Sequence, residues 1–159
     1  MTTLAYIKQA IISEIEGYEF YRMAAGQTRD VQMKETYLEL AEEERKHVVW
    51  LQDLHKSIES SSDFDLMSID APPSPEIFKW DKLDREDPKT ILSIFGIALQ
   101  LEKASFEFYK KASEEVEEKS AKELFKILEA WERAHYDVFN KEYDNLQEDW
   151  WSEQGFAPF

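Results

Sequence analysis

The sequence contains no cysteine and few residues that break helices. Among its 159 residues are 4 glycines and 5 prolines, whereas 14% are aromatic and 33% are charged. Without cysteine, disulfides, thiolate zinc sites and iron–sulfur clusters are excluded. The scarcity of glycine and proline argues against a β-sandwich or a disordered chain. We therefore expect one domain, residues 1–159, built from long helices around an aromatic core.

Positive charge is also scarce. The chain has 34 acidic and 19 basic side chains, for a formal net charge of −15. Such a charge disfavours binding to nucleic acid or to anionic membranes, and it suits a protein that binds cations. The first 17 residues are interrupted by Lys8, Gln9 and Glu14, so they fit neither a signal peptide nor a membrane span. We therefore expect a cytoplasmic protein with no nucleic-acid or membrane partner.

Four helical segments are predicted, at about residues 3–25, 30–58, 88–116 and 120–146. Gly26 is expected to end the first helix, and Pro88 to be the first residue of the third, capped by Asp87. Ser120 and Glu123 have the spacing of a capping box at the start of the fourth.

The expected connections are short, long and short. The long one, residues 59–87, suits two helical hairpins joined by a crossover. This pattern predicts an all-α fold, a four-helix bundle of the ferritin-like kind. The aromatic tail, residues 147–159, does not show a helical pattern, and we expect Trp150, Trp151 and Phe156 to pack over one end of the bundle.

The two halves of the chain repeat one another at a shift of 88 residues. The shift lays "EIEGYEFYRMAA" (14–25) on "EKASFEFYKKAS" (102–113). It also places Leu40, Glu44, Arg45 and His47 on Leu128, Glu132, Arg133 and His135. One ungapped shift that recovers both hairpins indicates an internal repeat rather than chance.

The repeated acids and histidines fall on the inward faces of the predicted helices. Apolar residues recur at alternating steps of three and four, and each series is interrupted near its middle by a glutamate or by a Glu-x-x-His pair. Several buried carboxylates without partners would cost several kcal/mol each. Two divalent cations would neutralise four of them, and histidines would add neutral nitrogen ligands. The predicted ligands are Glu14, Glu44, His47, Glu102, Glu132 and His135.

Each element of this pattern also has a simpler interpretation. A lone Glu-x-x-His pair is usually a solvated helix face, and His47 and His135 could be core histidines. Tyr21 and Tyr109 are either core aromatics or groups that hydrogen-bond beside the site. The third histidine, His55, has a glutamine three residues earlier and is not predicted to be a ligand.

Taken together, these motifs resemble the rubrerythrin-like di-iron proteins of the ferritin-like superfamily. The similarity extends over residues 5–146 and rests on "EIEGYEFY" and "LEKASFEFY", followed by "LAEEERKH" and "LEAWERAH". The resemblance implies that the six residues bind two iron ions, with Glu44 and Glu132 bridging. It also implies reduction of hydrogen peroxide or dioxygen at the di-iron centre.

Two features depart from the family pattern. Rubrerythrins proper carry a cysteine-ligated rubredoxin module, and Ser105 stands where their third helix offers a second glutamate. The remaining set of four glutamates and two histidines also occurs in bacterioferritins. Alternative functions are therefore ferroxidase activity with iron storage, or binding of manganese or zinc without redox catalysis. We expect a homodimer and a separate electron-donor protein.

Overall fold

The computed structural model describes residues 1–69 and 88–155, which contain four long helices and no strand. The helices are α1 (Thr3–Gln27), α2 (Val31–Glu59), α3 (Pro88–Glu115) and α4 (Lys119–Glu153), and a short 3-10 turn, η1 (Leu66–Ser68), follows α2. The prediction of an all-α fold is confirmed.

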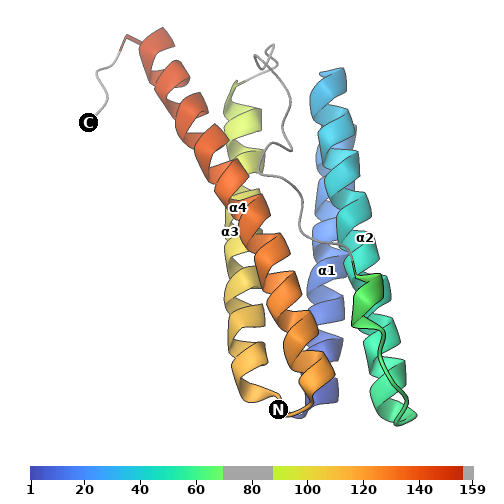
Figure 1. Ribbon diagram of the computed structural model, residues 1–159. Helices are drawn as coiled ribbons and strands as arrows, with labels where there is room; N and C mark the ends of the chain where they lie inside the picture. The colour runs from blue at the N-terminus through green and yellow to red at the C-terminus, as the bar shows by residue number, and fades with distance from the viewer. Residues whose placement is uncertain (70–87, 156–159) are drawn as a thin grey trace.

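The helices form two hairpins that pack together into a bundle (Figure 1). α1 pairs with α2 and α3 pairs with α4, each through a short turn, whereas residues 60–87 separate the two hairpins. This is the ferritin-like arrangement expected from the connections. Residues 70–87 of the crossover, including Asp87, lie outside the described residues.

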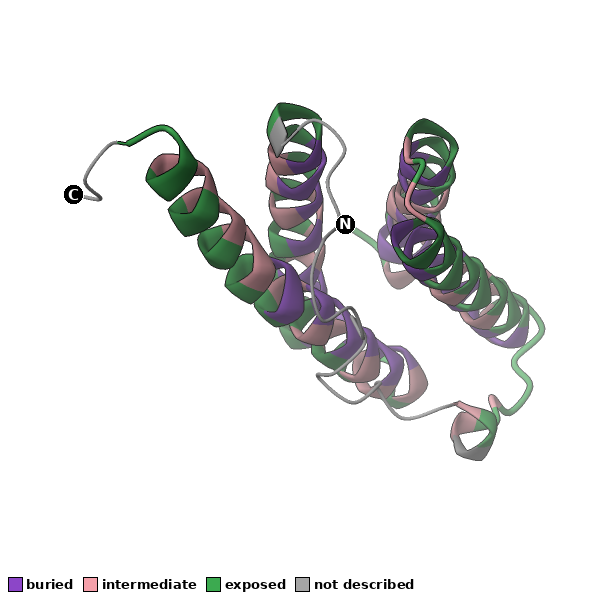
Figure 2. Ribbon diagram, turned by 90° about the horizontal axis from the view of Figure 1, so that it is seen from above, coloured by how far each residue is buried: buried purple, intermediate pink, exposed green. Residues whose placement is uncertain are grey.

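The core consists of two apolar clusters with a polar band between them. One cluster is centred on residues such as Tyr21, Phe95 and Phe139, and the other contains Tyr109 and Leu124. Each helix contributes residues to both clusters. The apolar stripe of each helix is interrupted near its middle, and these interruptions form the polar band. Figure 2 shows the buried residues on the inward faces of the helices. The predicted ligands therefore lie at mid-height in the bundle.

The end of α1 and the start of α4 differ from the prediction. α1 continues past Gly26 to Gln27 with Thr28 as C-cap, and Gly26 does not adopt the left-handed conformation expected of a capping glycine. α4 begins at Lys119 with Glu118 as N-cap, so Ser120 lies inside the helix. The Glu118 side chain accepts a hydrogen bond from the hydroxyl of Thr3 on α1 rather than from its own helix. This tertiary contact overrides the local capping signal.

The aromatic tail is helical over most of its described length, which corrects the expected end of the fourth helix at residue 146. α4 continues to Glu153, because no helix-breaking residue precedes Gly155, which has φ +73. Trp150 and Trp151 lie on this extension with ring centroids 5.0 Å apart. Figure 1 shows the extension diverging from α1 and α2, and Phe156 lies outside the described residues.

None of the described helices combines the length and the apolar character needed to cross a membrane.

Candidate metal centre

The six predicted ligands come together in the middle of the bundle, and each is at most 3% exposed. α1 and α3 each contribute one glutamate, and α2 and α4 each contribute a Glu-x-x-His pair. The side chains form two overlapping groups, and in each group the potential ligand atoms lie within 4.8 Å of one another. Glu44 and Glu132 belong to both groups.

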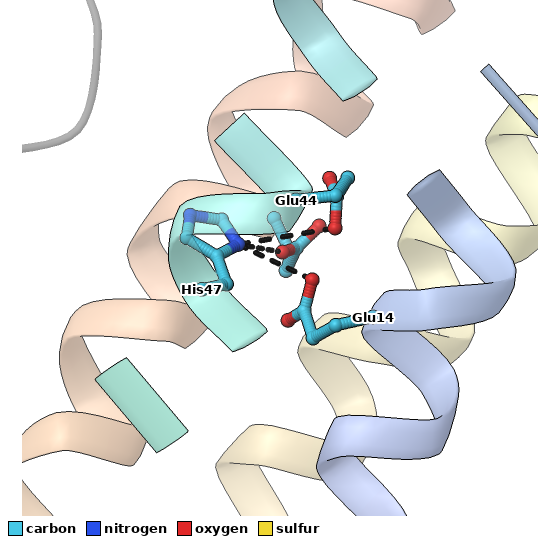
Figure 3. A group of neighbouring side chains, drawn as sticks. Glu14, Glu44 and His47 are labelled. Carbon is cyan, nitrogen blue, oxygen red and sulfur yellow. Dashed lines mark hydrogen bonds and ion pairs between the residues drawn. The ribbon is translucent and has the colours of Figure 1, made fainter. Parts of the chain in front are cut away.

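The first group surrounds His47. Its Nδ1 atom lies 3.2 Å from Glu14 Oε2, 3.1 Å from Glu132 Oε1 and 3.8 Å from Glu44 Oε2. In Figure 3 the carboxylates of Glu14, from α1, and Glu44, from α2, point toward the same edge of the His47 imidazole.

The second group surrounds His135 in the equivalent way. Its Nδ1 atom lies 3.3 Å from Glu102 Oε1, 3.5 Å from Glu44 Oε1 and 3.7 Å from Glu132 Oε2. The sequence repeat therefore corresponds to two similar half-sites. His55 takes no part in either group, and its Nδ1 faces Glu59 on the same helix at 3.6 Å.

Without cations, this cluster retains protons. Burial, reinforced by the charge of Glu132, raises the pKa of Glu44 and of Glu102 well above the usual 4.5. Burial also raises the pKa of Glu132, but hydrogen bonds with Glu102 and the histidines outweigh it and hold that pKa well below 4.5. Burial opposes protonation of His47, yet the carboxylates of Glu14 and Glu132 raise its pKa to about 9.

The donor set fits divalent cations. Glu44 Oε1, Glu102 Oε2 and His135 Nδ1 are buried and make no geometrically acceptable hydrogen bond within the described residues. Buried polar atoms are normally satisfied, and the three residues belong to one group whose potential ligand atoms lie within 4.8 Å of one another, as a cation site requires. Carboxylate oxygens and imidazole nitrogens are the ligands of non-haem iron, manganese and zinc sites. The cluster could therefore hold metal.

Comparison with known proteins identifies the family. The rubrerythrin family profile matches residues 6–143. The chain belongs to the rubrerythrin family. A hypothetical protein from Pyrococcus furiosus has a similar structure, with a TM-score of 0.71, 28% sequence identity, and coverage of 93% of this chain and 92% of that one. No curated protein matches the sequence significantly.

Two tyrosines connect the hairpins of this rubrerythrin-family bundle. Tyr21 of α1 donates a hydrogen bond to Glu102 Oε1 of α3, and Tyr109 of α3 donates one to Glu14 Oε1 of α1 at 2.5 Å. Burial, together with nearby carboxylates, raises the pKa of both tyrosines well above 10.0. Both hydroxyls therefore keep their protons and orient the carboxylates that accept them.

A pocket reaches the carboxylates from the side of α1 and α3. It has a volume of about 220 Å³, and Glu44, Glu102 and Glu132 are among its lining residues, whereas neither clustered histidine is. Small residues at equivalent positions of the repeat, Gly17 and Ser105, also line it. A Cβ atom at Gly17 would lie 3.4 Å from Glu44 Oε2. The absence of a side chain at Gly17 leaves this carboxylate accessible from the pocket.

Several residues beside the site were not predicted. Glu43 bonds to His135, Trp50 and Trp131 flank His47, and Gly17 opens the pocket. In the sequence, Glu43 is one of three consecutive acids in "EEER", a pattern typical of a solvated helix face. The repeat itself could have pointed to these residues. Glu43 aligns with Trp131 and Trp50 aligns with Val138, so these positions differ between the two halves.

The metal-free protein should become less stable as pH rises from about 6.5 to about 9, the usual and folded-state pKa values of His47. In this range the folded chain holds a proton on His47 that the unfolded chain has lost, so the free energy of unfolding falls with pH. Protonation of Glu44 and Glu102 acts in the same direction above pH 4.5. Thermal unfolding of chelator-treated protein, followed by circular dichroism, measures the change.

In the same experiment, metal-free His47→Gln should show a weaker pH dependence, because its imidazole is gone. A melting temperature that rises with pH in the metal-free wild type would contradict this description of the cluster.

Proposed function

We propose that this protein binds two iron ions in the glutamate–histidine cluster and reduces hydrogen peroxide or dioxygen there. One observation carries the proposal. The two groups of potential ligands each contain three glutamates and one histidine, and they share Glu44 and Glu132. Two cations that share two carboxylates form the kind of paired site used in two-metal chemistry, with the ions about 3.5–4 Å apart.

The balance of charge favours two ions rather than one. Four ionised glutamates and two neutral histidines carry a charge of about −4, which two divalent cations neutralise. A single cation would leave two carboxylate charges buried. Oxygen and imidazole ligands suit both iron and manganese. Membership of the rubrerythrin family supports iron.

The residues around the centre suit reduction of a small oxidant. When bound in its ferrous form, the metal pair supplies two electrons, which with two protons convert hydrogen peroxide into two molecules of water. Tyr21 and Tyr109 hold the carboxylates of Glu102 and Glu14 in place through their hydroxyl protons. The pocket between α1 and α3 admits a small molecule on the side away from the two histidines.

The proposed reaction needs a source of electrons. The sequence has no cysteine and hence no rubredoxin-type iron centre of its own. We propose that a separate donor protein reduces the centre and that the protein acts as a homodimer.

Removal of either clustered histidine should reduce the bound metal toward one ion per chain. His47→Ala and His135→Ala each delete the only nitrogen ligand of one group. His55→Ala is the matched control and should retain two ions, because His55 lies outside both groups. Metal analysis of the three variants, loaded under identical conditions, tests the assignment. Equal losses in His55→Ala and His47→Ala would contradict it.

The reduced, iron-loaded protein should be oxidised rapidly by hydrogen peroxide in a stopped-flow experiment. Oxidation by dioxygen alone, accompanied by accumulation of hundreds of ferric ions per particle, would instead support iron storage. If neither oxidant reacts with the iron-loaded protein, the proposed reduction is excluded.

Gly17→Val should slow the reaction with peroxide by about tenfold or more at unchanged metal content, because its side chain would enter the pocket beside Glu44. Gly26→Val is the control, since a Cβ atom at Gly26 meets nothing within 4 Å. Equal rates for the two loaded variants would show that oxidants do not enter through this pocket.

A further inference from the structure

The two halves of the centre differ in the residues that contact their histidines. The shift of 88 residues that superposes the ligands also aligns Glu43 with Trp131 and Trp50 with Val138. All four residues belong to the ligand-bearing helices α2 and α4. The proposed ligands are therefore repeated, but their neighbours are not. Glu43 bonds to His135, whereas Trp50 and Trp131 lie beside His47.

Behind His135 lies a carboxylate. Glu43 of α2 reaches across to α4, and its Oε2 atom is 2.6 Å from His135 Nε2. Its side chain is only 18% exposed. Because a carboxylate accepts hydrogen bonds, Nε2 is the nitrogen that carries the proton. When His135 is neutral, Nδ1 is then the unprotonated nitrogen, and it is the one that faces Glu44, Glu102 and Glu132, as a metal ligand requires.

Two indole rings lie beside His47. The ring centroid of His47 is 5.2 Å from that of Trp50 and 5.1 Å from that of Trp131. Its Nε2 atom is buried and has no hydrogen-bond partner among the described residues. Among the described residues, therefore, no carboxylate accepts a hydrogen bond from Nε2 of His47 as Glu43 does from His135.

We propose that the two metal positions are not equivalent. The position formed by His135 with Glu44, Glu102 and Glu132 binds a divalent cation more tightly than the position formed by His47 with Glu14, Glu44 and Glu132. Glu43 is the positioning residue that causes the difference. Loss of such a partner behind a metal-ligating histidine typically weakens binding by about 10–100-fold. The His47 position is therefore filled second and releases its ion first. This inference rests on the proposed two-metal site.

Titration of the metal-free protein with cobalt(II), followed by calorimetry and visible absorption, tests the inequivalence. Two binding steps should appear, with dissociation constants that differ by about 10–100-fold. Two ions bound with equal affinity would overturn the inference and leave the proposed site intact. No cobalt bound in the cluster would instead remove the proposed site itself.

Single-histidine variants then assign the steps. His47→Ala leaves the His135 position, and His135→Ala leaves the His47 position. Addition of Glu43→Leu should weaken cobalt binding by about 10–100-fold in the His47→Ala background and leave it unchanged in the His135→Ala background. Glu43→Gln, which keeps an acceptor but loses the charge, should have a smaller effect of the same kind.

Glu42→Gln is the matched control, because Glu42 is half exposed and pairs with Arg45 rather than with a histidine. It should leave both affinities unchanged. Equal weakening in both single-histidine backgrounds, or none in either, would overturn the role of Glu43.

Discussion

Four glutamate carboxylates and two imidazoles lie between two apolar clusters, and each of the six residues is at most 3% exposed. Burial of so many ionisable groups is strongly unfavourable unless their charges are balanced. In the metal-free chain, protons provide part of that balance, and the raised pKa values of Glu44, Glu102 and His47 express this. Two divalent cations would provide the balance more completely. The hydrogen bonds of the two tyrosines and the predicted dependence of stability on pH both follow from this constraint.

The two pairs of helices, α2 with α4 and α1 with α3, contribute different groups to the centre. α2 and α4 supply the two clustered histidines and the residues that contact them, whereas α1 and α3 each supply one glutamate and one tyrosine and most of the pocket lining. Because each tyrosine bonds the glutamate of the other hairpin, the two hairpins must be docked for either glutamate to be oriented. The site is therefore a product of the whole bundle, and residues 6–143, the part matched by the rubrerythrin family, contain every residue in it.

The sequence was sufficient to predict the fold and the six clustered residues, because two independent regularities agreed. Helical spacing placed Glu14 and Glu102 inside, and the repeat placed them on equivalent helices. A contact that occurs in only one half of the repeat, such as that of Glu43 with His135, could not be predicted from these two regularities. Helix ends were predicted less well where a tertiary contact decides them, as at Glu118. The end of α4 differs from the prediction for another reason. The residue that ends the helix is Gly155, and the aromatic run before it is helical although its sequence shows no helical pattern.

The most direct test of the central claim is the position of metal in crystals of the iron-loaded protein, located by anomalous scattering at the iron absorption edge. The account predicts two peaks about 3.5–4 Å apart, both within bonding distance of Glu44 and Glu132, with His47 and His135 each bound to one of them. A single peak, peaks at surface carboxylates, or none among the four buried glutamates would contradict it.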